Sequence, residues 1–268
     1  MRTIMALLAA LAAAPQVPTE APPATAAATG SKVWVGRNAE FEEFLKTARI
    51  ARIDEVPVGV TRPRRAFFSP GGLAASAIIK DLRPGPRLGY WESYKSEIAA
   101  YEIDRLLGLE MVPVTVERRI EGNFLSVQLW VESCKWLKQR RAAGESAPDT
   151  AGWNREVHRQ RVFDNLVANI DRNEGNLLVD PSWNLILVDH SRAFTTTMKM
   201  PFEKEMKRID RPVFERLKAL DLPALKQRVG PWVLDDGWIK ALLKRRDGIL
   251  EHFRALAEQR GEAEVFIP

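Results

Sequence analysis

The sequence is poor in the residues that build disulfide scaffolds and zinc sites. Its 268 residues include one cysteine, Cys134, and three histidines. A single cysteine excludes an intrachain disulfide and a cysteine-based zinc site. The excess of positive over negative charge is also small, because the chain has 40 Lys and Arg residues and 35 Asp and Glu residues, a formal net charge of +5. No basic stripe is interleaved with aromatic residues, so we expect no nucleic-acid partner.

Long apolar runs are missing too, apart from a short one at residues 4–14 (IMALLAALAAA). That run is shorter than the roughly 20 residues needed to span a bilayer, but it suits the apolar region of a signal peptide. Residues 15–30 are rich in Pro, Ala and Thr, which is typical of a disordered linker. We therefore expect a leader over 1–30, export to the periplasm or outside the cell, and no integral membrane segment after the leader. The alternative is a cytoplasmic protein whose start codon is placed too early.

The chain as a whole has an ordinary globular composition, with 46% hydrophobic and 28% charged residues. Its patterning predicts an α+β fold: a small antiparallel sheet with a helix over 31–134, then a mostly helical part over 135–268. In the first part we expect helices at 40–48 and 94–107, and strands within 51–80, 111–120 and 124–131. In the second part we expect helices at 153–170, 211–220, 222–229 and 236–257, and short strands at 177–179 and 185–188.

Candidate catalytic residues are concentrated in 165–194. Asp171 and Asn176 lie in a polar loop after a predicted helix, and Asp189 directly follows four apolar strand residues. Two carboxylates and an amide oxygen suit Mg²⁺, with phosphate oxygens completing its coordination. One carboxylate would remain to orient an attacking hydroxyl and accept its proton. The alternative is a polar turn with a helix-capping aspartate.

This segment resembles the catalytic region of the protein-kinase-like superfamily, in its atypical branches. These are the phosphoinositide 3-/4-kinases, actin-fragmin kinase, HipA-type kinases and secretory-pathway casein kinases. Residues 171–176 (DRNEGN) keep the Asp, the Arg and the final Asn of the D-R-H-x-x-N loop, and 188–194 (VDHSRAF) is similar to the D-N-G-R-G-F metal-binding motif. The resemblance implies a two-lobed protein-kinase-like fold. It also implies that Asp171 is the catalytic base or hydroxyl-orienting residue, and that Asn176 and Asp189 hold Mg²⁺ on ATP.

The first half matches the same superfamily in order. Lys80, late on an apolar strand, resembles the lysine that contacts the α- and β-phosphates, and Glu97 on the next helix resembles its ion-pair partner. Gly59 and Thr61 lie where such families place the loop that covers the phosphates. Residues 129–134 would form the hinge that binds adenine. The resemblance extends over 51–194 and implies ATP and Mg²⁺ as cofactors.

Two departures from the family pattern keep alternatives open. Asn173 replaces the family His, and His190 with Ser191 replaces the residues after the metal-binding Asp. The leading hypothesis is a Mg²⁺-dependent kinase that transfers the γ-phosphate of ATP to an unidentified hydroxyl on a protein, lipid or small molecule. The alternatives are a catalytically inactive nucleotide-binding pseudokinase acting through a protein partner, adenylyl transfer, or a structural envelope protein. A Ser-His-Asp hydrolase triad is rejected, because neighbouring side chains of an extended segment point to opposite faces.

Overall fold

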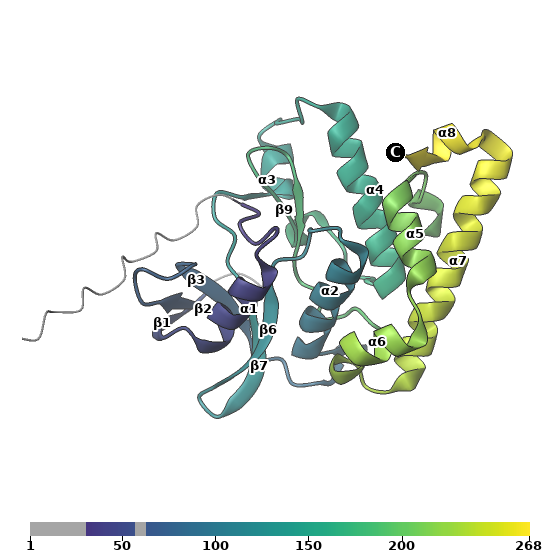
Figure 1. Ribbon diagram of the computed structural model, residues 1–268. Helices are drawn as coiled ribbons and strands as arrows, with labels where there is room; N and C mark the ends of the chain where they lie inside the picture. The colour runs from purple at the N-terminus through teal and green to yellow at the C-terminus, as the bar shows by residue number, and fades with distance from the viewer. Residues whose placement is uncertain (1–30, 57–62) are drawn as a thin grey trace, which may run out of the picture.

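The computed structural model describes residues 31–56 and 63–268. A sheet with two helices is followed along the chain by a mostly helical half (Figure 1). The five-stranded sheet is antiparallel throughout, in the order β1-β2-β3-β7-β6. Its strands are β1 (Ile50–Glu55), β2 (Arg64–Phe68), β3 (Ser76–Lys80), β6 (Thr115–Ile120) and β7 (Asn123–Leu129).

The two faces of this sheet have different partners. Ala77 and Ile79 of β3 are buried on one face, where Phe68 of β2 packs edge-on against Phe44 with ring centroids 4.9 Å apart. Phe44 belongs to helix α1 (Asn38–Thr47), so α1 covers this face. Successive strand residues alternate between faces, and Lys80 therefore lies on the opposite face.

Helix α2 (Tyr94–Leu107) has the bounds that its apolar spacing predicts. It begins after Ser93, whose side chain accepts a hydrogen bond from the backbone of Lys95, and it ends at Gly108 in the left-handed conformation (φ +56°). The helix packs against β6 and β7. The hydroxyl of Tyr101 donates to Glu42 Oε1 at 2.8 Å, which fastens α2 to α1.

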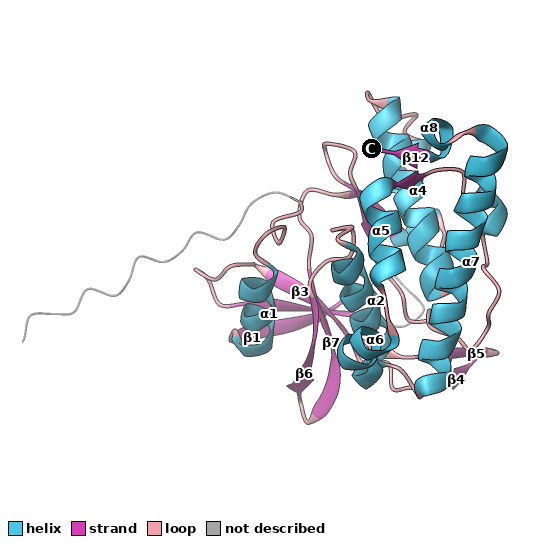
Figure 2. Cartoon of the chain, turned by 45° about the vertical axis from the view of Figure 1, so that its right-hand side comes forward, coloured by secondary structure: helices cyan, strands magenta, loops and turns pink. Residues whose placement is uncertain are grey.

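Between β3 and α2 the structure contains a hairpin that the sequence analysis missed. It consists of β4 (Gly85–Arg87) and β5 (Tyr90–Glu92), in a stretch for which the sequence analysis predicted neither strand nor helix. Each strand has only three residues, too few to show a period of two, and β4 consists of Gly, Pro and Arg. Trp91 packs edge-on against Trp238 at 6.0 Å, which places the hairpin beside one end of α7 (Figure 2).

The second half is built mainly from helices, and its core includes Phe163, Leu166 and Phe253. Helix α4 ends at Val167, three residues before the predicted end at 170, because Ala168 adopts a left-handed conformation (φ +52°) that stops it. The prediction of that boundary was wrong. The helices are α3 (Leu137–Ala142), α4 (Thr150–Val167), α5 (Arg211–Ala219), α6 (Leu222–Arg228), α7 (Asp236–Arg260) and α8 (Glu262–Val265).

Short strands complete the helical half, and two of them lie within the candidate segment 165–194. They are β8 (Lys135–Trp136), β9 (Leu177–Val179), β10 (Leu185–Leu187), β11 (Ile209–Asp210) and β12 (Phe266–Ile267). β9 and β10 form the hairpin predicted at 177–188. Within the described residues, none of the helices combines the length and apolar character that a membrane span requires.

Candidate active site

Lys80 is the centre of a three-residue ion-pair cluster that joins the two halves of the chain. Its Nζ lies 2.5 Å from Glu97 Oε1 and 2.9 Å from Asp189 Oδ1. The side chain of Glu97, on α2, is 1% exposed, whereas that of Asp189, just past β10, is 37% exposed. The buried glutamate therefore fixes the lysine, and the lysine in turn holds an aspartate that solvent and ligands can reach.

The charges of this cluster reinforce one another. Burial alone would lower the pKa of Lys80, but the negative charges of Asp189 and Glu97 outweigh burial and raise the pKa above its usual range. Burial alone would likewise raise the pKa of Glu97, and the charge of Lys80 outweighs it and lowers the pKa well below its usual range. Lys80 and Glu97 therefore stay ionised throughout the physiological pH range.

The segment after β10 is bent so that Asp189 and its neighbour face different partners. Asp189 has a left-handed backbone (φ +60°), which is uncommon for a residue with a Cβ. The next backbone N–H, of His190, donates to Glu97 Oε2 at 3.0 Å, and the Ser191 hydroxyl donates to Asp189 Oδ1 at 3.2 Å. Glu97 thus holds both Lys80 and the backbone beside Asp189.

His190 is a buried connector and forms no triad with Ser191 and Asp189. Its Nε2 lies 2.8 Å from Nη2 of Arg172, and a guanidinium can only donate, so Nε2 is the acceptor and Nδ1 carries the proton. Nδ1 lies 3.5 Å from Glu97 Oε2. Burial lowers the pKa of His190, which keeps the ring neutral between Glu97 and Arg172.

Arg172 holds the loop that carries Asp171 and Asn176. Its Nε and Nη2 each donate to one oxygen of the buried Asp164 carboxylate at 3.0 Å. Its Nη1 donates to the carbonyls of Asn176 and Val188, both at 2.8 Å. Because Val188 precedes Asp189, this one buried guanidinium ties the loop of Asp171 and Asn176 to the segment that carries Asp189.

Asp171 is the other accessible carboxylate of the site, with 45% of its side chain exposed. Its Oδ2 accepts a hydrogen bond from Arg192 Nη1 at 3.1 Å. The Asn176 amide nitrogen donates to the backbone carbonyl of Asp171 at 3.1 Å, so its amide oxygen is turned away from that carbonyl. Arg192 also donates to Glu92 Oε1 at 2.6 Å.

The oxygen donors suit a hard divalent cation. Asp189 Oδ1 accepts hydrogen bonds from Lys80 and Ser191, whereas its Oδ2 accepts none from the described residues. The Asn176 amide oxygen likewise accepts no hydrogen bond within the described part of the chain. One carboxylate and one amide oxygen, with phosphate oxygens and water, match the way Mg²⁺ is held on nucleotides. Within residues 31–56 and 63–268 no cluster of three or more His, Cys, Asp or Glu residues could bind a metal ion alone.

The structure brings together most of the residues that the sequence singled out. Lys80, Glu97 and Asp189 are in direct contact, while Asp171 and Asn176 share one loop. Gly59 and Thr61 lie outside the described residues. The sequence analysis missed the role of Glu92, which no motif marks, and of Arg192, which stands inside the quoted motif but was given no role.

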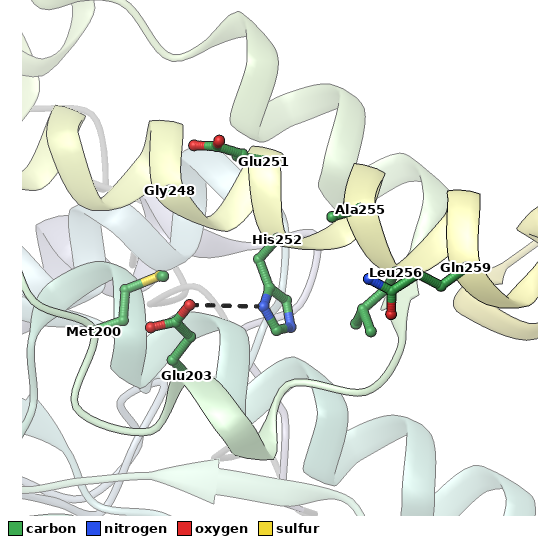
Figure 3. Close-up of a pocket in the computed structure, with 8 residues that line it drawn as sticks. All are labelled: Met200, Glu203, Gly248, Glu251, His252, Ala255, Leu256 and Gln259. Atoms are coloured by element: carbon green, nitrogen blue, oxygen red, sulfur yellow. Dashed lines mark ion pairs between the residues drawn. The ribbon is translucent and has the colours of Figure 1, made fainter.

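Two surface hollows elsewhere contain none of these residues. One, of about 310 Å³, lies along α7 between Met200 and Gln259, and there His252 Nδ1 is 3.9 Å from Glu203 Oε1 (Figure 3). The other, of about 610 Å³, surrounds the turn between β2 and β3. The candidate site is therefore defined by its side-chain contacts and not by these hollows.

Comparison with solved structures identifies the fold. The Golgi casein kinase with Mn/ADP bound superposes with a TM-score of 0.67 at 15% identity, over 86% of this chain and 78% of that one. The fold is that of the atypical protein-kinase-like proteins. The hydra Fam20 structure with sugar gives 0.65 at 15% identity, over 84% and 90% of the two chains. The Helicobacter pylori proinflammatory kinase CtkA gives 0.51 at 11% identity, over 81% and 96%.

At the level of sequence, no protein-family model and no curated protein matches the chain. The family resemblance seen in the motifs is thus confirmed as a shared fold: the atypical two-lobed kinase-like architecture with an antiparallel sheet.

Proposed function

We propose that this protein is a kinase that transfers the γ-phosphoryl group of ATP to a hydroxyl acceptor in a Mg²⁺-dependent reaction. The observation that carries the proposal is the position of Lys80, held between the buried Glu97 and the accessible Asp189. A lysine so fixed can bind α- and β-phosphate oxygens without losing its charge. The kinase-like fold supports this assignment.

The roles of the remaining residues follow from their chemistry. Asp189 and Asn176 would hold Mg²⁺, which neutralises phosphate charge when it is bound. Asp171 would orient the acceptor hydroxyl and accept its proton through Oδ1, since Oδ2 is held by Arg192. Gly59 and Thr61 would cover the phosphates. The acceptor is proposed only as a hydroxyl, on a protein, lipid or small molecule.

The test is transfer of ³²P from γ-labelled ATP to the protein itself, to water or to added hydroxyl substrates, with and without Mg²⁺. We expect Asp171→Asn to lower the rate on the order of 100- to 10,000-fold, the range of a lost general base. Asp247→Asn, on an exposed part of α7, is the matched control and should keep the wild-type rate. Equal rates for wild type and Asp171→Asn would contradict the proposal.

Two departures from the family pattern, Asn173 in the loop and His190 with Ser191 after Asp189, favour one alternative, an inactive nucleotide-binding protein that acts through a partner. In that case ATP binds with Mg²⁺, yet no labelled product forms with any acceptor and Asp171→Asn leaves ATP binding unchanged. Measuring binding and transfer on the same preparation separates the two functions.

We also propose that the protein is exported, on the basis of the leader-like residues 1–30. The likeness to a Golgi casein kinase supports a place in a secretory compartment. Fractionation of cells that express the full chain, beside a variant lacking 1–30, tests this. Recovery of both proteins in the cytoplasmic fraction would contradict export.

A further inference from the structure

The loop 171–176 carries no positive charge that could reach a phosphate. Its one cationic residue, Arg172, is 1% exposed and already spans Asp164, two backbone carbonyls and His190. Asn173 is uncharged, and its side chain is used within the loop: it accepts from Gly175 N at 2.8 Å and donates to the Asp171 carbonyl at 2.9 Å. A developing phosphoryl charge next to Asp171 would need a cation from elsewhere.

Arg192 places a guanidinium at this position. Its Nη1 donates to Asp171 Oδ2 at 3.1 Å and its Nε donates to Glu92 Oε1 at 2.6 Å. The guanidinium carbon lies 4.7 Å from the ring centroid of Tyr90. Its Nη2 has no hydrogen-bond partner in the described residues, so two of the five N–H donors are in use and others are available to a phosphate oxygen.

Both ends of this arrangement are anchored. Glu92 is buried and ends the β4–β5 hairpin, which Trp91 fastens to α7 through Trp238. The backbone around Arg192 is bonded on both sides: Ser93 N donates to the Ser191 carbonyl at 3.0 Å and Phe194 N donates to the Val167 carbonyl at 2.7 Å. The guanidinium is therefore held in place before any ligand arrives, which lowers the cost of using it in a reaction.

We infer that Arg192 is a positioning residue of the proposed phosphoryl transfer: it fixes the Asp171 carboxylate and sets beside it the positive charge that the loop lacks. With Oδ2 held, Asp171 presents Oδ1 to the acceptor hydroxyl in one orientation. The planar fork of arginine holds its donors at fixed positions that suit this two-point contact, whereas a lysine presents all its donors from one nitrogen atom. The inference rests on the proposed function, and its test separates the two.

The experiment compares Arg192→Ala, Arg192→Lys and the wild-type full chain. We expect Arg192→Ala to lower kcat on the order of 100-fold, as for loss of one fixed donor, with the ATP dissociation constant within about 3-fold of wild type because Lys80 and Asp189 are untouched. Arg192→Lys should lie between the two. Added methylguanidine should restore part of the kcat of Arg192→Ala. Arg87→Ala, at a partly exposed arginine of the same hairpin, is the matched control; its kcat should equal that of wild type and should not change with methylguanidine.

A second readout needs no activity. Amide hydrogen exchange of residues 168–176 should be faster in Arg192→Ala than in wild type, and unchanged in Arg87→Ala. Unchanged loop exchange in Arg192→Ala, or a kcat equal to wild type, would overturn the inference. So would a parallel loss of kcat and ATP affinity without methylguanidine rescue. A wild-type protein that transfers no phosphate would refute the proposed function, and the exchange data would still decide whether Arg192 positions Asp171.

Discussion

The buried pair of Lys80 and Glu97 makes a sharp prediction about stability. In Lys80→Met the side chain keeps most of its length and loses its charge. The Glu97 side chain, which is 1% exposed, then loses its ion partner and keeps the hydrogen bond from the backbone N–H of His190. Removing one member of a buried pair costs roughly 3–5 kcal/mol of unfolding free energy. Asp189→Asn leaves the 2.5 Å contact between Lys80 and Glu97 intact, and we expect a cost under about 1 kcal/mol for this half-exposed group.

Two further features of the prediction follow from the same charges. Lys80→Met combined with Glu97→Gln removes both charges, so it should recover much of the loss caused by Lys80→Met alone. The deficit of Lys80→Met should also grow as the pH rises above about 4.5. In the wild type Lys80 lowers the pKa of Glu97, which stabilises the fold as Glu97 ionises; in the variant, burial opposes that ionisation.

Urea unfolding followed by circular dichroism measures these differences, with equal slopes required for the comparison. The expected order of stability is wild type and Asp189→Asn first, then the double variant, then Lys80→Met. Equal losses of unfolding free energy for Lys80→Met and Asp189→Asn would contradict this prediction. So would a double variant whose loss of unfolding free energy equals the sum of the losses caused by Lys80→Met alone and Glu97→Gln alone.

Three other predictions rest on single groups. Burial raises the pKa of Asp104 from its usual 3.8 to about 7, so the free energy of unfolding should fall as the pH rises from about 4 to 7. In urea titrations, Asp104→Asn should remove roughly 3–5 kcal/mol of that pH dependence. A variant with the same pH dependence as wild type would contradict this. Gly108→Ala should cost roughly 1–3 kcal/mol in the same assay, because φ is +56° and a Cβ would meet the Arg216 guanidinium; an unchanged midpoint would contradict it. Burial raises the pKa of the half-buried Cys134 to about 12. Iodoacetamide should therefore modify Cys134 at pH 8 more slowly than it modifies a fully exposed thiol. Equal rates would contradict the burial of this side chain.

Much of the fold could be predicted because local patterns dominate it. The apolar spacing of 94–107 and the glycine that follows set the bounds of α2, and the turn at 180–184 set the β9–β10 hairpin. The boundary of α4 could not be predicted, because Ala168 in the left-handed region stops the helix and nothing in the residue type marks that. The β4–β5 hairpin packs against α7 through Trp91 and Trp238, a contact that its own sequence does not reveal.

The candidate site likewise contains residues that the sequence predicted and contacts that it could not predict. Asp171, Asn176 and Asp189 were found by motif spacing, and Lys80 with Glu97 by their order along the chain. The partners of Arg192 could not be found, because Glu92 and Asp171 are joined to it only through folding. His190 was rejected as a triad member from strand alternation, but its contacts with Glu97 and Arg172 appear only in three dimensions.

The most direct test of the central claim, that this site binds Mg²⁺ with ATP, is a thermal-shift titration of the full chain with ATP, with and without Mg²⁺. A ligand bound only by the folded state stabilises it by about 2.7 kcal/mol at a hundredfold excess over Kd. Asp189→Asn and Asp247→Asn are measured beside the wild type. We expect a Mg²⁺-dependent rise in Tm for wild type and Asp247→Asn, and no such rise for Asp189→Asn. No rise at millimolar ATP, or an equal rise in Asp189→Asn, would contradict it.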